Sequence, residues 1–156
     1  GITAIPALGY EMLSVSLPPD DQPITDSIRR GAPSDRMNKL SIFNPGAVRA
    51  TNQEVGRHRA EPTGRLRFPA QDQVLLLHYK YISLDWQHLR NLELQRKLGS
   101  VDKKNQWGIQ YSRTRAEVQH EWDRLYQQSV ADVLSPDYNA HQQHSAPESR
   151  WWRARS

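Results

Sequence analysis

The sequence predicts an α+β fold in which a strand-rich N-terminal half is followed by two amphipathic helices. Short apolar runs separated by proline, glycine and asparagine fill the first half, which is typical of strands joined by turns. Two later windows place apolar residues three and four positions apart, which is typical of helices. The regular alternation of strand and helix in a complete doubly wound domain is missing. A length of 156 residues suits one domain or part of a larger one.

Several strands and one short helix are expected in the first half, each bounded by turn-forming residues. The last strand is the strongest, because three leucines precede a histidine, a lysine and two tyrosines. The short helix is expected over residues 25–30, with Thr25 as its N-cap and Gly31 as its C-terminal stop. The strands are expected over 2–16, 40–43, 51–59, 64–68 and 74–81.

The first long helix is expected over residues 83–98. Ser83 is a suitable N-cap, Asp85 places a negative charge in the first turn, and Gly99 ends the helix. The three-to-four spacing of its apolar residues predicts that one face is buried. The residues expected on that face are Ile82, Trp86, Leu89 and Leu92 or Glu93.

The second long helix begins at Thr114-Arg115-Ala116-Glu117, which fits a capping box. An amphipathic stripe then continues to about Leu134. It consists of Val118, Trp122, Leu125, Ser129 and Val133. Beyond this point the chain becomes polar and aperiodic, so residues 135–156 are expected to form a disordered tail behind a folded region at 1–134.

Net charge and cysteine content restrict the classes of function. A net charge of +4 and a pI near 9.6 favour an anionic partner, such as a nucleotide, a phosphorylated glycan, a membrane face or nucleic acid. A balance of 21 basic against 17 acidic residues is too even for a dedicated nucleic-acid arm. The absence of cysteine excludes disulfides and thiolate chemistry. No apolar run approaches the roughly 20 residues of a transmembrane helix, and we expect a cytoplasmic protein, at most associated with the inner membrane face.

Two of the six histidines, His58 and His78, stand apart because each lies within or at the end of an expected strand. A neutral imidazole binds a divalent metal or acts as a general base, and the alternative is a hydrogen-bonded structural role. Side chains alternate along a strand, so Lys80 is expected on the same face as His78, and Tyr79 and Tyr81 on the other. The lysine suits an anionic ligand such as a diphosphate, or else lies at the sheet margin with its amine in water.

An aromatic segment with Trp107 and Tyr111 follows the first long helix. The two rings suit a stacking platform for a sugar or a base, and the alternative is that they cover an edge of the core. The sequence contains no phosphate-binding loop, dinucleotide-binding glycine motif or nucleophile elbow. It also contains no D-x-D, and Asp20-Asp21 is interpreted as a solvated turn after two prolines.

Four segments occur in a characteristic order. The first two are Gly9-Tyr10-Glu11-Met12 and Gly31-Ala32-Pro33-Ser34, the latter followed by Lys39 and Ile42-Phe43-Asn44-Pro45. The third is Gly56-Arg57-His58-Arg59-Ala60-Glu61-Pro62-Thr63-Gly64. The fourth is Leu76-Leu77-His78-Tyr79-Lys80-Tyr81, with Arg90, Arg96, Leu98 and Asn105-Gln106-Trp107-Gly108 behind it. Over roughly residues 1–134, this order resembles the C-terminal half of bacterial family-2-type glycosyltransferases with the GT-A fold.

The resemblance implies a nucleotide-sugar-dependent transferase of polysaccharide biosynthesis. In such enzymes the N-terminal half binds the nucleotide and supplies D-x-D metal ligands, and we expect that half to be missing from this chain, which begins with Gly rather than Met. A histidine of the C-terminal half completes the metal site, and His78 or His58 is the candidate. We expect a divalent metal, Mn²⁺ or Mg²⁺, only when the missing half is joined. The catalytic base lies in that half or is Glu11.

The resemblance also implies contacts with substrate. Lys39 and Lys80 would face phosphate or the acceptor, and Trp107 would lie near the acceptor, with Tyr111 as the second ring. The implied ligands are a nucleotide sugar and a glycan acceptor. We therefore expect an acceptor-side portion of a glycosyltransferase that is inactive alone, with the missing half or a second copy of the chain as its partner.

Two other classes of function remain open. The basic pI, the interleaved aromatic residues and the Trp151-Trp152-Arg153 end favour a non-catalytic binding module for nucleic acid or anionic polysaccharide. A structural or interaction protein is the other class, because amphipathic helices left uncovered by a truncated sheet would dock on a partner.

Overall fold

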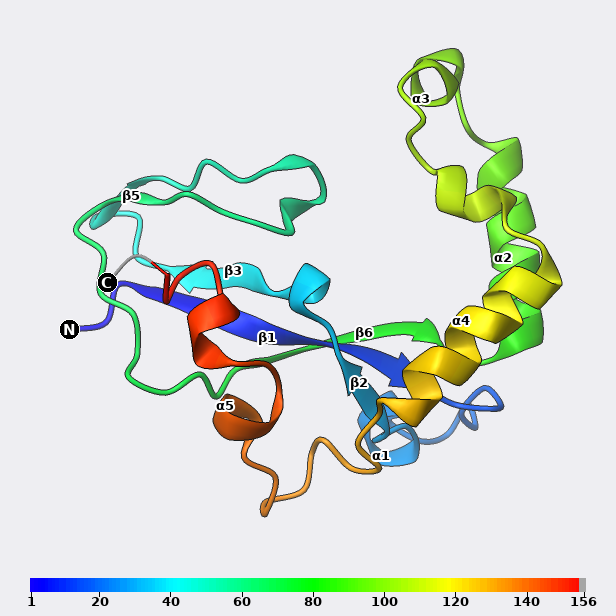
Figure 1. Cartoon of the computed structure of the whole chain (residues 1–156), viewed down its shortest axis with the longest axis horizontal. Helices are drawn as coiled ribbons and strands as arrows, with labels where there is room; N and C mark the ends of the chain where they lie inside the picture. Colours follow the sequence, from blue (N-terminus) through cyan, green and yellow to red (C-terminus); the bar gives the residue numbers. More distant parts are fainter. Residues whose placement is uncertain (155–156) are drawn as a thin grey trace.

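The computed structural model describes residues 1–154 and confirms the α+β class, with a strand-rich first half followed by several helices. The central strand is β1 (Ala4–Leu13). β6 (Leu75–Tyr81) runs parallel to one edge of β1, and β2 (Gly31–Pro33) and β3 (Lys39–Phe43) run antiparallel along the other edge. β1 and β6 therefore end on the same side of the molecule (Figure 1).

Both faces of β1 are covered. Leu8, Tyr10 and Met12 point into the main core on one face. On the other face Gly9 has no room for a side chain, because a Cβ atom there would lie 2.3 Å from the Cβ of Met37. The turn between β2 and β3 therefore packs directly on β1, and both strands pair with the same edge of it.

β6 gains one residue relative to β1 near its carboxyl end. His78 lies opposite Glu11, but Tyr81 lies opposite Leu13, so two steps along β1 match three along β6. Tyr79 packs against the main core, whereas Tyr81 packs with Leu13 in a separate cluster. The prediction that the two tyrosines share a face is therefore wrong, because the register shift ends the regular alternation.

The segment between β3 and β6 contains less strand than the sequence predicts. β4 (Val48–Ala50) and β5 (Thr63–Gly64) pair over a short stretch, and the longer strands expected over 51–59 and 64–68 do not form. Two of the three residues in the 3₁₀ turn η2 (Val55–Arg57) have positive φ angles, which breaks an extended backbone.

The short helix α1 covers Ile24–Ser27, and Pro23 precedes it without a side-chain cap. Thr25 lies inside the helix, so its predicted N-cap role is wrong. The helix begins earlier because the fixed φ of proline suits a helix start. Gly31 does not stop the helix but begins β2, where its backbone exchanges hydrogen bonds with Val130.

The first long helix, α2 (Leu84–Arg96), begins as predicted. The Ser83 hydroxyl accepts a hydrogen bond from the Trp86 backbone N–H at 3.4 Å. Two short elements follow it, α3 (Ser100–Lys104) and the 3₁₀ turn η3 (Ile109–Ser112), and Tyr111 of the aromatic segment lies in η3. Together they form an extension away from the sheet (Figure 1).

The buried face of α2 matches the prediction only in part. Ile82, which precedes the helix, is buried, and Trp86 packs against the main core. Leu89 was expected inside but is 65% exposed. Gln87 and Asn91, two polar residues four positions apart, are the buried residues of the helix, at 3% and 5% exposure. Because residues four apart share a helix face, α2 turns a polar face inwards.

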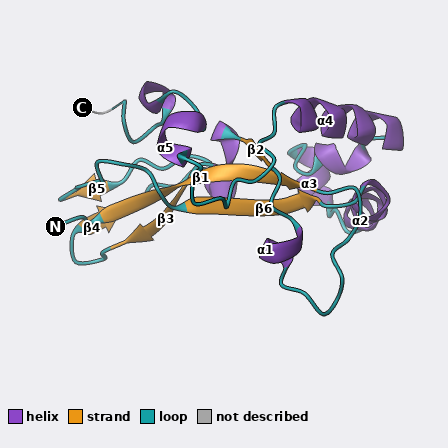
Figure 2. Cartoon of the chain, turned by 90° about the horizontal axis from the view of Figure 1, so that it is seen from below, coloured by secondary structure: helices purple, strands orange, loops and turns teal. Residues whose placement is uncertain are grey.

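The second long helix, α4 (Arg115–Gln127), confirms the predicted capping box. The Glu117 carboxylate accepts from the Thr114 backbone N–H at 2.7 Å, and the Thr114 hydroxyl accepts from the Glu117 backbone N–H at 3.3 Å. The helix ends before the predicted Leu134. Figures 1 and 2 both place α2 and α4 at the carboxyl end of β1 and β6, opposite the β4–β5 hairpin and the N-terminus.

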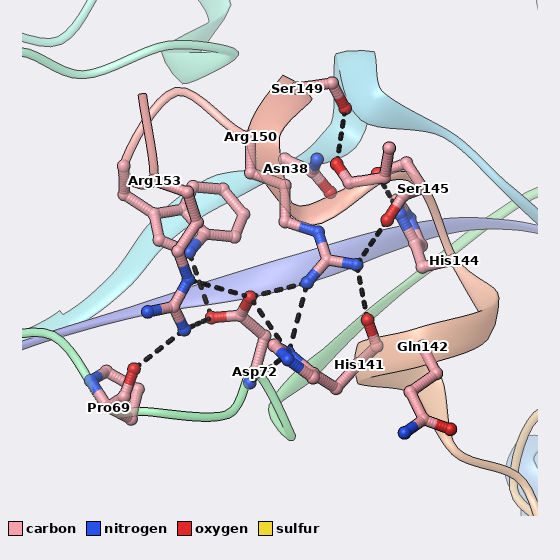
Figure 3. Close-up of polar contacts among 12 residues, drawn as sticks. Asn38, Pro69, Asp72, His141, Gln142, His144, Ser145, Ser149, Arg150 and Arg153 are labelled. Atoms are coloured by element: carbon pink, nitrogen blue, oxygen red, sulfur yellow. Dashed lines mark hydrogen bonds and ion pairs between the residues drawn. The ribbon is translucent and has the colours of Figure 1, made fainter. Parts of the chain in front are cut away.

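The segment after Leu134 is packed against the sheet, which corrects the expectation of a disordered tail; its last two residues lie outside the described part. It contains α5 (Ala140–Gln143) and the 3₁₀ turn η4 (Pro147–Ser149). The physical reason is a buried carboxylate, Asp72, to which the segment brings several hydrogen-bond donors (Figure 3). Trp152, 2% exposed, joins the main core beside them.

The α-helices described above lie within residues 24–143. Every helix there is too short or too polar to cross a bilayer.

Candidate functional site

A cavity of about 1190 Å³ opens where β1 and β6 end. Its walls come from these two strands, the turn before β3, the loop around Gly56, the inner face of α2, η3 and one side of α4. The crevice outside the carboxyl ends of parallel strands is the usual place for ligands in sheets with helices packed on them. The cavity is therefore the candidate site.

Most of the site residues predicted from sequence line this one cavity. His58, His78, Lys39, Lys80 and Tyr111 all contribute to its wall, although they come from four separate segments of the chain. The exception is Trp107, which does not line it and is 50% exposed. The predicted pair of rings is therefore divided, and only the tyrosine faces the site.

His78 is held by Glu11. The two residues face each other in the register of β6 on β1, and the His78 Nδ1 lies 2.6 Å from the Glu11 Oε2. A carboxylate only accepts, so the Nδ1 carries the proton and donates it. When His78 is neutral, its Nε2 then has a free lone pair.

His58 has the same tautomer for a different reason. Its Nδ1 lies 2.6 Å from the backbone carbonyl oxygen of Arg36, which only accepts a hydrogen bond. Burial lowers the pKa of His58 below its usual value, and the charges of Lys39 and Arg36 act in the same direction against the raising effect of this hydrogen bond. The ring is therefore neutral at pH 7 with a lone pair on Nε2.

Gly56 makes room for that imidazole. Its φ angle is +78°, and a Cβ atom there would lie 2.7 Å from both Cδ2 and Nε2 of His58. Glycine is thus needed for the backbone conformation and for the position of the ring.

Lys80 lies in the depth of the cavity wall. Its Nζ is 3.3 Å from the Tyr81 hydroxyl, which in turn donates to the Glu121 carboxylate at 3.0 Å. Burial lowers the pKa of Lys80, while the nearby Glu11 acts in the opposite direction. Burial also raises the pKa of Tyr81 to about 12, so this hydroxyl remains a hydrogen-bond donor at neutral pH.

The acidic side chains that line the cavity are paired, whereas several of the basic ones are not. The lining carboxylates are engaged: Glu11 with His78, Glu121 with Arg113, and Glu117 in the capping box of α4. Four lining cations form no ion pair with any carboxylate that the structure describes. These cations are Arg36, Lys39, Lys80 and Arg90.

Sequence reasoning missed the α2 wall. Trp86, Gln87, Arg90 and Asn91 line the cavity, with the Arg90 guanidinium 5.2 Å from the centre of the Trp86 ring. The leucines of this helix dominated the prediction of its buried face. The signal in the sequence was Gln87 and Asn91, two amide side chains four positions apart. An amphipathic reading assigns such residues to solvent, because it assumes that the buried side of a helix is apolar.

Metal-binding capacity is limited in the part of the chain that the structure describes: no three histidine, cysteine or carboxylate side chains gather as a possible ligand set. Comparisons with protein-family models, with curated proteins and with solved structures give no match for this chain. Inferences about function therefore depend on the geometry of the cavity. It offers two imidazole nitrogens, unpaired cations and buried amides to one ligand space.

Proposed function

We propose that this chain is the acceptor-side portion of a nucleotide-sugar-dependent glycosyltransferase of the GT-A fold, with the D-x-D residues located upstream of it. The supporting observation is that the four segments of the resemblance, distant in sequence, converge on one cavity. They contribute Glu11, Ser34, His58 and the strand end from His78 to Tyr81. The open side of β6, which pairs only with β1 among the described strands, leaves a sheet margin beside this cavity.

The two histidines fit part of a metal site. Each holds its Nδ1 proton in a hydrogen bond and leaves Nε2 for a ligand, which is the usual arrangement around metal-binding imidazoles. Both rings line the same cavity. Two nitrogens alone make an incomplete site, and carboxylates of the D-x-D segment would supply the rest. Nitrogen ligands favour Mn²⁺ over Mg²⁺.

A divalent ion bound there would neutralise charge on the departing diphosphate. The chain's own residues would do the remaining work. Glu11 orients the His78 ring, and Lys39 and Lys80 attract anionic groups. Tyr111 and the α2 wall bound the space for the acceptor. Because the donor site lies outside this chain, we expect little or no transfer by the chain alone.

The test compares this chain with a version extended upstream through a D-x-D segment. Nucleotide sugars are titrated into each with Mn²⁺ or Mg²⁺, and hydrolysis is followed by release of the nucleoside diphosphate. The extended protein should bind and slowly hydrolyse one nucleotide sugar, and His78→Ala or His58→Ala should weaken Mn²⁺ binding about 10–100-fold. An extended protein that neither binds nor hydrolyses any nucleotide sugar would refute the proposal.

A second candidate is non-catalytic binding of an anionic glycan, supported by the four cations without ion pairs. Such binding should weaken steeply with added salt, because it depends on exposed charge. Titration of acidic polysaccharide, DNA and RNA at two salt concentrations separates this function from the first. Binding that ignores salt, or that is absent for all three polymers, would remove it.

A further inference from the structure

The inner face of α2 carries one buried polar atom that no described residue satisfies. The α2 wall consists of Trp86, Gln87, Arg90 and Asn91. Gln87 is 3% exposed, yet its Oε1 has no hydrogen-bond partner among the described residues. A buried amide oxygen without a partner is costly, and a ligand group that donates to it would remove this cost.

A second group without a hydrogen-bond partner lies on β6, in another residue that lines the cavity. The Tyr79 hydroxyl is buried without a hydrogen-bond partner in the described part of the chain, and Tyr79 lines the cavity from β6. Together with the amides of Gln87 and Asn91, it offers both donors and acceptors. A ligand with several hydroxyl groups, which donate and accept in turn, matches this set.

The unpaired positive charges of the cavity indicate a ligand with an anionic group. Arg36, Lys39, Lys80 and Arg90 lack ion pairs within residues 1–154, while the lining carboxylates are already engaged. The cavity is thus positively charged before any ligand enters. Arginine and lysine around one space suit a phosphate or carboxylate group.

We propose that the α2 wall, with Tyr79 and Lys80, binds a sugar that carries a phosphate or carboxylate group, and that this anionic sugar is the acceptor. This inference rests on the proposed function and names the acceptor class for the same cavity. The amides and the phenol bind the sugar hydroxyls. The unpaired cations bind its anionic group.

The test is NMR titration of the full chain with matched sugars. Glucose, galactose, mannose and N-acetylglucosamine are each added as the neutral sugar and as the 1-phosphate, and glucuronate and galacturonate test the carboxylate arm. The side-chain NH₂ signals of Gln87 and Asn91 report directly on the wall. At least one anionic sugar should shift both signals, and its neutral form should bind about tenfold more weakly, as expected for the loss of one charge-assisted contact.

Matched variants separate binding from folding. Gln87→Leu should lower the affinity for the anionic sugar about tenfold while leaving the fold at least as stable, because the unpaired amide is removed. Gln95→Leu, the same change on α2 outside the cavity, should leave affinity unchanged. Lys80→Met should remove most of the preference for the anionic form, and Lys104→Met on α3 should not.

Two results would overturn the inference: no anionic sugar shifts the two amide signals, or neutral sugars bind as well as their phosphates. Inorganic phosphate that binds as tightly as every sugar phosphate would also overturn it, because the wall would then contribute nothing. The proposed function has a separate readout in the extended protein. If the extended protein hydrolyses a nucleotide sugar but this chain binds no anionic sugar, only the acceptor class is refuted. If this chain binds an anionic sugar but the extended protein hydrolyses no nucleotide sugar, the transferase and the acceptor role are refuted and the sugar-binding site remains.

Discussion

Arg150 Nη1 lies 2.6 Å from Asp72 Oδ2, and neither side chain is exposed to solvent. The two residues are 78 positions apart and join the C-terminal segment to the loop that leads into β6. The other guanidinium nitrogen of Arg150 donates to the backbone carbonyls of His141 and Ser145 (Figure 3). The same C-terminal segment reaches β1, where the His144 Nε2 is 2.7 Å from the Gly9 carbonyl oxygen.

Removal of the charge on Asp72 should destabilise the whole fold. Asp72→Asn leaves the buried Arg150 without its counter-ion, and we expect the free energy of unfolding to fall by about 3–5 kcal/mol. Denaturant titration measures the change. The double variant Asp72→Asn/Arg150→Met should recover part of the loss, since the uncompensated charge is removed with its partner.

Asp137→Asn is the matched control, because Asp137 is exposed. We expect it to change stability by no more than about 0.5 kcal/mol. Equal effects of the two substitutions would show that the buried ion pair does not hold the C-terminal segment in place.

The same carboxylate predicts a pH dependence of stability. Burial alone would raise the pKa of Asp72, but hydrogen bonds from Arg153, Arg150 and Trp152 outweigh it and leave the pKa below its usual value. A group with a lowered pKa in the folded state stabilises the fold above its unfolded pKa, about 3.9, and loses this contribution as pH falls through the lower folded value.

Unfolding should therefore become easier below about pH 4, and Asp72→Asn should flatten this part of the curve. Thermal unfolding between pH 3 and pH 6 checks the slope. A wild-type and a variant curve that run parallel through this range would contradict the assignment.

The cap of α4 should be worth a measurable amount of stability. Thr114→Ala removes one half of the capping box and should cost about 0.5–2 kcal/mol. Thr25→Ala is the control, because Thr25 lies within α1 and caps nothing. Urea unfolding of both variants should separate them, and an equal loss would mean that the box at α4 contributes no stability.

The space at Gly56 should control His58. Gly56→Ala places a Cβ 2.7 Å from the imidazole at a backbone φ of +78°, and the strained conformation should cost about 1–2 kcal/mol. The displaced ring becomes less buried, so its lowered pKa should rise towards the ordinary value near 6.5. NMR titration of the His58 ring signals measures this directly.

Gly99→Ala serves as the control for that experiment. Its φ is −73°, and the nearest atom to an added Cβ is the Asp102 Oδ2 at an ordinary contact distance of 3.4 Å. It should leave the His58 titration unchanged. If Gly56→Ala also leaves it unchanged, the ring is not held against this glycine.

The predictions from sequence succeeded where the signal is local. The strand at β6 and the N-caps at Ser83 and Thr114 depend on residues within a few positions of each other, and the structure has all three. The strand expected over 51–59 failed because two positive φ angles in η2 interrupt the extended backbone there. The strand expected over 64–68 is reduced to Gly64 at the end of β5, where φ is +115°. On α2 the prediction held for Ile82 and Trp86 but not for Leu89. It missed the buried Gln87 and Asn91, because apolar periodicity assumes that polar residues face water.

Part of the candidate site could be predicted from the sequence. His58 and His78 were singled out as residues of expected strands, and both line the cavity. Trp107 was expected beside them but lies outside it. Arg36, Gln87 and Asn91 were missed. Tertiary packing places them at the cavity, and the neighbouring residues in the sequence give no sign of this.

The amino-acid sequence by itself determined the strand at β6 and where the two long helices begin, because these depend on side-chain periodicity and capping over a few residues. Only the tertiary structure decided that two histidines twenty positions apart share one cavity and that α2 buries the side chains of Gln87 and Asn91. It also decided that Arg150 forms a buried ion pair with Asp72. These outcomes depend on contacts between distant segments. Each such contact forms only once the sheet has brought its partners together, so no local pattern encodes it.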